Sequence, residues 1–196
     1  LVGGGNSGVF VYSNSYEGYN FTGQYGKGGS NIKSDDGSSE TISASGSSFD
    51  FAVTTDALMP GLSAGAGYGE IANAGAGTNG NKEDAHYTAF ATYTMSGVTV
   101  GYQESMVEDN TTGGADEQAQ GWGVAVNLMD GLSASYGERE VVFNNPSAAD
   151  VTADEEGVAV AYTMGSAKIT IQNNEVTNNG GTTGSNDENT EIALSL

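Results

Sequence analysis

Apolar and polar residues alternate one by one along most of this chain. The stretch from Ala85 to Met95 shows the pattern: one side carries Tyr87, Ala89, Ala91, Tyr93 and Met95, and the other carries His86, Thr88, Phe90, Thr92 and Thr94. A period of two places these sets on opposite faces of a β-strand, whereas a helix requires a period near 3.6. Helical periodicity is scarce throughout the sequence. The chain is therefore predicted to be all-β.

Short and long connections between the predicted strands follow one another strictly in turn. Eleven strands are expected, near 8–17, 19–28, 47–56, 62–73, 85–97, 98–109, 117–130, 132–144, 156–167, 168–179 and 189–196. The short turns are Glu17-Gly18, Met59-Pro60-Gly61, Ser96-Gly97, Asp130-Gly131 and Gly165-Ser166. The long, acidic connections lie near 29–46, 74–84, 110–116, 145–155 and 180–188. This alternation predicts antiparallel hairpins whose tight turns all lie at one end.

The two faces of the predicted strands differ in a way that favours a membrane barrel. One face is rich in Val, Ala, Leu and Tyr, and the other is rich in Gly, Ser, Thr, Asn and Gln, which are too small and polar to form a dry core. Hydrophobic residues make up 37% of the chain, and no run approaches the roughly eighteen apolar residues of a membrane-spanning helix. The pattern predicts a transmembrane antiparallel up-and-down β-barrel around water. A secreted all-β domain or a β-solenoid is the alternative.

The composition excludes several other classes of protein. The net charge of −20, from 25 acidic and 5 basic residues, opposes nucleic-acid binding because phosphate backbones are repelled. Ten tyrosines and six phenylalanines argue against a disordered chain. The absence of cysteine excludes a disulfide scaffold and a thiolate metal site. No signal peptide is visible at the start, and the opening residues are interpreted as the middle of a chain.

Three hairpin segments resemble those of the Gram-negative general porins, particularly the alphaproteobacterial ones. They are 93–102 (YTMSGVTVGY), 127–136 (NLMDGLSASY) and 162–170 (YTMGSAKIT). The resemblance runs from about residue 8 to the end. It implies a sixteen-stranded, usually trimeric barrel in the cell outer membrane, with both termini on the periplasmic side. Residues 1–196 would then be a single β-barrel domain, the C-terminal portion of a porin barrel.

Two features depart from the porin pattern. The chain ends on Leu196, where porins usually end on an aromatic residue, and the loop that constricts the pore has no counterpart in the sequence. An odd number of strands does not close a single-chain bacterial barrel. The sequence is therefore interpreted as lacking the N-terminal strands, the constriction loop and a residue or two at the C-terminus.

The polar face supplies the candidate pore-lining residues, which are Asp50, His86, Gln103, Arg139 and Lys168. Arg139 and Lys168 are candidates for the basic wall charges that the resemblance implies, because charged rings on a wall set the selectivity of a channel. Each could instead pair with a neighbouring carboxylate. His86 is expected at a solvated lumen or rim position. A single histidine and the lack of a Gly-x-Ser-x-Gly motif argue against an enzyme.

Aromatic residues on the apolar face are expected to form the interfacial girdles of a membrane barrel. The candidates are Tyr68, Tyr93, Tyr102, Trp122, Tyr136 and Tyr162. Three of these tyrosines begin a Tyr-x-Glu sequence that recurs every 34 residues, which gives the carboxylates Glu70, Glu104 and Glu138. These three, called here the Tyr-x-Glu carboxylates, would lie just above the girdle. They are either the first solvated residues there or ligands of Ca²⁺ or Mg²⁺ that bridge to lipopolysaccharide phosphates.

The predicted function is an outer-membrane porin for passive diffusion of small hydrophilic solutes and ions. Its partners would be outer-membrane lipids, lipopolysaccharide and two further copies in a homotrimer. The acidic loops predict a bias toward cations, because like charge around a pore mouth concentrates counter-ions. One alternative is an acidic, calcium-binding surface or adhesive β-protein. Another is an outer-membrane barrel devoted to export or to one specific solute.

Overall fold

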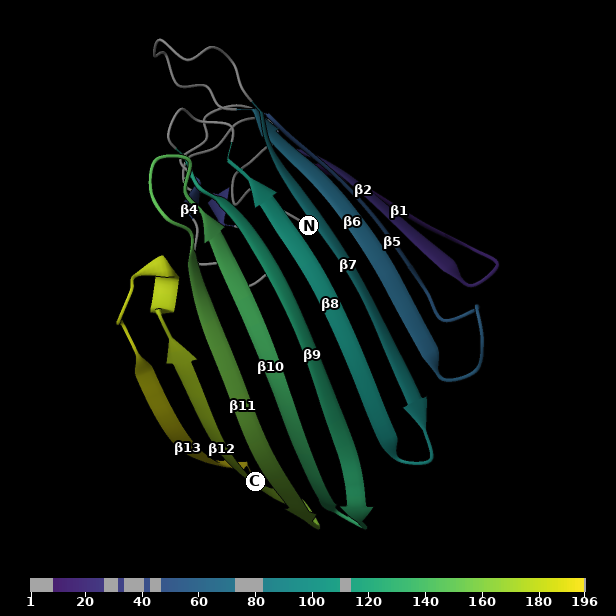
Figure 1. Ribbon diagram of the computed structural model, residues 1–196. Coiled ribbons are helices and arrows are strands. Elements are labelled where there is room, and N and C mark those ends of the chain that lie inside the picture. The colour runs from purple at the N-terminus through teal and green to yellow at the C-terminus, as the bar shows by residue number, and fades with distance from the viewer. Residues whose placement is uncertain are drawn as a thin grey trace.

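The computed structural model describes residues 9–26, 32–33, 41–42, 47–72, 83–109 and 114–195. Eleven strands form one antiparallel sheet in which every strand pairs with its neighbours along the chain (Figure 1). They are β1 (Val9–Tyr16), β2 (Tyr19–Gly26), β5 (Ser48–Thr55), β6 (Leu62–Ala72), β7 (Glu83–Met95), β8 (Val98–Glu108), β9 (Asp116–Met129), β10 (Leu132–Asn144), β11 (Val151–Met164), β12 (Ala167–Thr177) and β13 (Asp187–Ser195). A separate two-residue pair joins β3 (Ile32–Lys33) to β4 (Thr41–Ile42), and a 3-10 turn, η1, spans Asn179–Gly181. The predicted up-and-down antiparallel sheet is confirmed.

Tight turns connect the hairpins at one end of the sheet, and the strand ends that the longer connections join lie at the other end (Figure 1). In Glu17-Gly18 the two φ angles are +49° and +82°, and in Ser96-Gly97 they are +51° and +81°. Positive φ at both central positions is the geometry of a type I′ turn, whose twist matches that of the strands it joins. Glycine at the second position therefore fixes where these two hairpins turn. We refer to the two ends of the sheet as the short-turn end and the long-loop end.

Most strand boundaries lie within two residues of the prediction. The largest difference is at β11, which begins at Val151 rather than near residue 156. Residues 151–155, which end in Asp154 and Glu155, pair with β10 and belong to the sheet, so the predicted loop at 145–155 ends at residue 150. The β3–β4 pair inside the predicted loop 29–46 was not expected. The predicted loops at 74–84 and 110–116 lie mostly outside the described residues.

The two faces of the sheet have different environments. From β5 onward, most large exposed apolar side chains share one face, as Tyr102, Trp122, Val158 and Ile171 illustrate. We call this the apolar face, and the opposite one the polar face. On β1, Val9 and Val11 are exceptions that lie on the polar face. So much exposed apolar surface is unfavourable in water and favourable in hydrocarbon.

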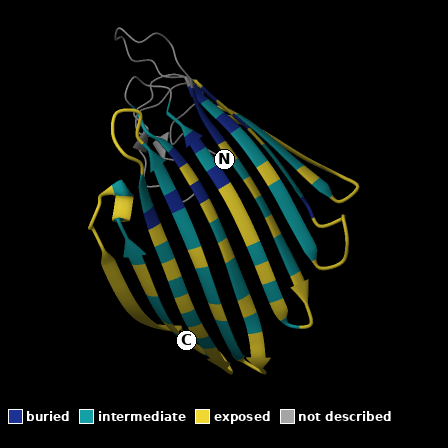
Figure 2. Ribbon diagram, viewed as in Figure 1, coloured by how far each residue is buried: buried dark blue, intermediate teal, exposed yellow. Residues whose placement is uncertain are grey.

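Buried residues gather near the long-loop end of the sheet (Figure 2). The buried apolar residues among those described are small in number: Ile71, Ala85, Val107, Ala119, Val141 and Ala153. Such a set does not make the dry core of a two-layer sandwich. Among the described residues, no helix is long and apolar enough to cross a membrane. The architecture is that of the wall of a β-barrel, seen as a curved sheet with β1 and β13 at its edges.

Candidate pore wall

The strand register places all five predicted pore-lining residues on the polar face. Gln103 and Arg139 lie in one row of directly paired residues, in the order Gln103, Gly121, Arg139 and Glu155 across β8 to β11. Asp50 and His86 lie in a second row, one on each side of Gly69. Paired residues point to the same side of a sheet because the pleat alternates along each strand. Their shared face follows from the register, whereas their role in a pore stays a prediction.

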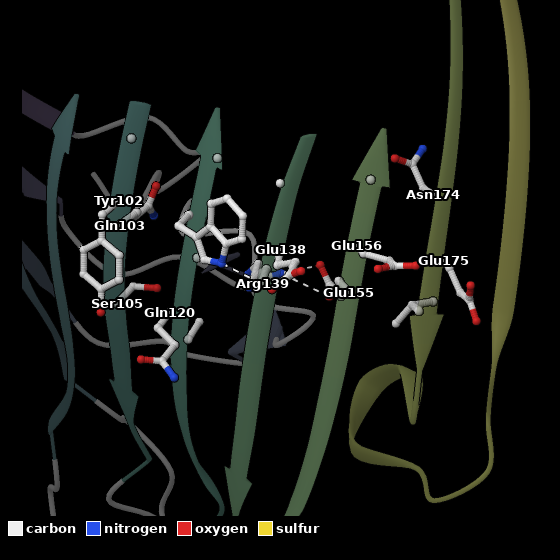
Figure 3. A pocket seen from close by; sticks show the side chains of 18 of the residues that line it. Tyr102, Gln103, Ser105, Gln120, Glu138, Arg139, Glu155, Glu156, Asn174 and Glu175 are labelled. Carbon is white, nitrogen blue, oxygen red and sulfur yellow. Dashed lines mark hydrogen bonds and ion pairs between the residues drawn. The ribbon is translucent and has the colours of Figure 1, made fainter. Parts of the chain in front are cut away.

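Arg139 forms an ion pair with Glu155 in the middle of this wall. Its Nη1 atom lies 3.2 Å from both carboxylate oxygens of Glu155, which is the residue directly opposite on β11 (Figure 3). Nη2 is shielded from solvent and has no hydrogen-bond partner among the described residues. The two side chains are 26% and 39% exposed, so the pair contributes only about 0–1 kcal/mol to stability. Its main effect is to hold opposite charges side by side on the wall.

A row of four glycines runs across the wall beside this pair. Gly101, Gly123, Gly137 and Gly157 are directly opposite one another on β8, β9, β10 and β11. A Cβ at Gly123 would meet only the backbone of Tyr136 and Gly137, at 3.4 and 3.8 Å, so no side chain covers that position. A hollow of about 860 Å³ lies here, and its lining includes the glycine row, Arg139 and Glu155 (Figure 3). Bare backbone over four strands leaves room beside the charged pair.

Four ionisable side chains are buried on the polar face toward the long-loop end. Asp50 is 1% exposed, Asp84 3%, and His86 and Glu117 7% each. Each of the four interacts with other groups of the protein. His86 was expected to be solvated, and this expectation is wrong because its side chain is almost completely covered. The register explains the grouping, since Asp50, His86 and Glu117 share one row across β5 to β9.

Lys168 lies apart from the other basic residue of the wall. It is the second residue of β12, paired with Thr163 and Ser195 near the short-turn end. The row that contains Arg139 and Glu155 reaches β12 at Val176, eight residues further along the strand, or about 26 Å at the usual rise per residue. The two predicted wall charges therefore do not form one cluster.

The predicted girdle aromatics all lie on the apolar face. Tyr93 and Tyr162 stand close to the short turns, and the other four stand further along their strands. The rings of Trp122 and Tyr136 pack edge to face with centroids 5.7 Å apart, and Tyr68 packs against Tyr87 at 5.1 Å. Large amphipathic rings in such positions are typical of the membrane–water interface.

The Tyr-x-Glu carboxylates lie on the apolar face beyond these rings, on β6, β8 and β10. Glu138 accepts hydrogen bonds from Tyr136 Oη at 2.6 Å and Trp122 Nε1 at 3.3 Å. Tyr68 donates in the same way to Glu70. No group of three or more histidine, aspartate or glutamate side chains in the described part of the chain is arranged to hold a metal ion. Divalent-cation bridging by these separate carboxylates stays a prediction.

A row of four glutamates on the same face was not predicted from the sequence. Glu138, Glu156, Glu175 and Glu188 are directly opposite one another on β10 to β13. Tyr136 Oη also lies 3.1 Å from Glu156 Oε2, so its single hydroxyl proton is shared between the first two glutamates of the row. Like charges directly opposite in a sheet repel. Nothing in the local sequence reveals this row or the glycine row, because both depend on pairing between distant segments.

Solved structures share this fold. No protein-family model and no curated protein matches the chain. The outer-membrane channel DcaP of Acinetobacter baumannii aligns with a TM-score of 0.72 and 12% identity, over 95% of this chain and 60% of that one. The anion-selective porin of Comamonas acidovorans gives 0.69 and 11%, over 95% and 58%. OmpT of Vibrio cholerae, described in a trimer form, gives 0.64 and 14%, over 95% and 62%.

These likenesses establish the fold as that of the bacterial outer-membrane porins. The chain spans about three fifths of the length of the porins it matches. At 11 to 14% identity, solutes, selectivity and assembly do not transfer from one protein to another.

Proposed function

We propose that this chain forms the wall of a passive, non-enzymatic porin in the outer membrane of a Gram-negative bacterium. The observation that carries the proposal is the division of one sheet into two faces. The apolar face exposes Val, Ile, Leu and aromatic side chains, which lipid would cover, and the polar face is lined by glycine, small polar residues and charged groups. A closed sheet with such faces encloses water and lets small hydrophilic solutes and ions diffuse through. In the membrane we propose a homotrimer, as in the trimeric form of OmpT.

We further propose a preference for cations. The polar face of the described strands carries six acidic residues against Arg139 and Lys168, and the acidic residues are Asp50, Asp84, Glu117, Glu155, Asp187 and Glu191. The whole chain has a net charge of −20. Negative potential in and around a pore raises the local concentration of cations. The Comamonas porin of similar fold is anion-selective, so this preference is a property of the charges of the individual chain.

Planar-bilayer recording tests both parts of the proposal. Stepwise, ohmic conductance increases are expected when the purified protein is added to a bilayer in KCl. With a tenfold KCl gradient, the reversal potential should have the sign of a cation-selective pore in dilute salt and move toward zero as salt screens the charges. An adhesive calcium-binding protein would give no steps. A solute-specific barrel would show block by its one solute, and anion preference in dilute salt would contradict the proposed bias.

The Tyr-x-Glu carboxylates are the proposed contact between the barrel and lipopolysaccharide at the membrane surface. Glu70 and Glu138 are held by tyrosine hydroxyls at the upper edge of the aromatic girdle. Carboxylates beside anionic lipopolysaccharide repel its phosphates, and hard divalent cations such as Ca²⁺ or Mg²⁺ bind both kinds of oxygen. We propose that the cations bridge the barrel to the lipid at this level.

A further inference from the structure

The hollow on the polar face is bounded by two neighbouring rows of paired residues. The glycine row continues to Thr92 on β7 at one end and to Asn174 on β12 at the other. The row of Gln103, Arg139 and Glu155 lies two residues, or about 7 Å, further toward the long-loop end. Members of both rows line the 860 Å³ hollow, which is within the range of about 300–1,000 Å³ for small-molecule sites. A second hollow of about 450 Å³ continues it over the glycines toward the short-turn end.

The floor of this hollow is bare backbone in the middle and covered at one edge. A Cβ at Gly137 would meet only backbone atoms of Trp122 and Gly123, at 3.1 Å and beyond. At Gly157 the position of a Cβ is 2.7 Å from the Oδ1 atom of Asn174. The Asn174 amide therefore lies over this glycine, beside a flat surface that a ring-shaped solute can approach closely.

Two amide side chains flank the floor with unused hydrogen-bonding capacity. Gln103 and Asn174 are exposed, and neither side chain forms a hydrogen bond with another described residue. They lie on opposite sides of Arg139 and Glu155 (Figure 3). An amide both donates and accepts hydrogen bonds. By contrast, the amide of Asn173 on the opposite face donates to Thr190 and Glu188.

The charges around the hollow favour a neutral solute. Arg139 and Glu155 lie 3.2 Å apart and largely neutralise each other. Asp187 is the one further charged residue of the polar face in the described lining. An anion would therefore meet a guanidinium that is already paired and a carboxylate that repels it. A cation would gain only one unpaired carboxylate on the last strand.

An aromatic ring lies at the β7 side of the same hollow. Phe90 is directly opposite Gln103, and its Cε1 atom is 2.6 Å from the position of a Cβ on Gly65, so the ring extends over that glycine. The other aromatic side chains of β7 to β9 belong to the apolar face. The negative face of an aromatic ring attracts C–H groups. A sugar ring offers such groups on its faces and hydroxyl groups around its rim.

We propose that this part of the polar face is a subsite for small neutral saccharides. The inference rests on the proposed porin function and names the class of solute that the wall retains. A sugar ring lies on the bare glycine floor, and its hydroxyls hydrogen-bond to Gln103, Asn174 and the Arg139–Glu155 pair. From β8 to β12 there are four strand spacings, about 19 Å, which is room for a monosaccharide or a disaccharide. Binding is weak because each hydrogen bond replaces one to water.

Ion current through single channels tests the subsite in the intact protein. Glucose and sucrose, added at constant KCl, should each reduce the current along a saturating curve. Polyethylene glycol of similar size should reduce it linearly with concentration, because it acts only on viscosity and free volume. Linear curves for both saccharides would overturn the subsite. Saturation by lysine or by citrate with linear saccharide curves would overturn it as well, since the site would then be one for ions.

Two variants and a matched control locate the effect on this wall. Asn174→Leu and Gln103→Leu should each raise the half-saturating saccharide concentration roughly fivefold, the equivalent of one lost hydrogen bond. Asn173→Leu changes the same residue type at the neighbouring position on the opposite face and should leave the curve unchanged. An equal shift in Asn173→Leu, or no shift in the other two, would contradict the assignment.

Conductance in salt alone separates this inference from the proposed function. Normal steps from each variant show that it is folded and inserted. A lack of steps from the wild type would refute the pore itself. Block by only one of the two saccharides would identify a solute-specific barrel and so contradict the passive porin, whereas steps with linear saccharide curves would leave the porin standing without the subsite.

Discussion

The pair formed by Arg139 and Glu155 gives the sharpest prediction about ion selectivity. In the wild type the two opposite charges lie 3.2 Å apart, so their fields largely cancel at a passing ion. Arg139→Gln removes the positive member and leaves Glu155 as a full unit charge on the wall. Glu155→Gln removes the negative member and leaves Arg139 as a full positive charge on the wall. The two variants should therefore shift selectivity in opposite directions, toward cations and toward anions respectively.

The size of the shift follows from Coulomb's law. A unit charge interacts with an ion 5 Å away in water by about 0.8 kcal/mol, and screening at 0.1 M salt leaves about 0.5 kcal/mol. That energy corresponds to roughly twofold enrichment of one ion and twofold depletion of the other. The cation-to-anion permeability ratio should change about fivefold in 0.1 M salt and less than twofold in 1 M salt. Folding should change little, because so exposed a pair is worth only about 0–1 kcal/mol.

Reversal potentials in KCl gradients at both salt concentrations measure this effect. The control is Glu138→Gln, which removes the same charge as Glu155→Gln from the adjacent strand but on the opposite face. If Glu138→Gln shifts the permeability ratio as far as Glu155→Gln, the polar face is not the lining of the pore. If neither Arg139→Gln nor Glu155→Gln shifts it, the pair does not face the ion path.

Three further predictions concern the turns, the glycine row and the membrane surface. Gly61→Ala should lower the unfolding temperature more than Gly165→Ala, and gel migration after heating measures the difference. Both residues have positive φ, so a Cβ at either costs about 1–2 kcal/mol. Only the Cβ at Gly61 would also clash with a backbone oxygen, 2.3 Å away. Equal losses would contradict this. Gly123→Gln should lower single-channel conductance without changing selectivity, since it places a neutral side chain over bare wall; unchanged conductance would show that the row does not border the ion path. Replacing all three Tyr-x-Glu carboxylates by glutamine should abolish the loss of thermal stability that a chelator causes in lipopolysaccharide-bound protein, and an undiminished chelator effect would leave them as solvated surface.

Local patterns predicted the strands well because the information for them is local. Alternation assigned both faces of β7 and β8 correctly, and glycine marked the turns between hairpins. The predicted start of β11 is five residues late because Asp154 and Glu155, at the end of residues 151–155, are typical of a loop. Their place in the sheet comes from pairing, with Glu155 opposite Arg139, and a pairing between distant residues has no signature in either strand alone.

The glycine row and the glutamate row could not be predicted from local sequence patterns either, because both depend on pairing between distant residues. Gly101, Gly123, Gly137 and Gly157 are separated by 22, 14 and 20 residues along the chain, so no periodicity points to them. The regular spacing of the Tyr-x-Glu carboxylates was visible, whereas the row of four glutamates on β10 to β13 was not. The burial of His86 was equally hidden, because it depends on what covers the strand and not on the strand's own pattern.

The order of strands in the sheet also has a consequence for how the chain folds. Apart from the β2–β5 ladder, which spans β3 and β4, every ladder of the eleven-stranded sheet joins strands that are consecutive in the sequence. Contact order within the sheet is therefore low for an all-β protein. Hairpins closed by two-residue turns, as at Ser96-Gly97, lose little chain entropy on closing and can form before the others. The ladders across the longer connections then join preformed hairpins, and lengthening such a connection costs only about 0.6 kcal/mol per doubling. Sequence drift and insertion in those connections are therefore compatible with an unchanged wall.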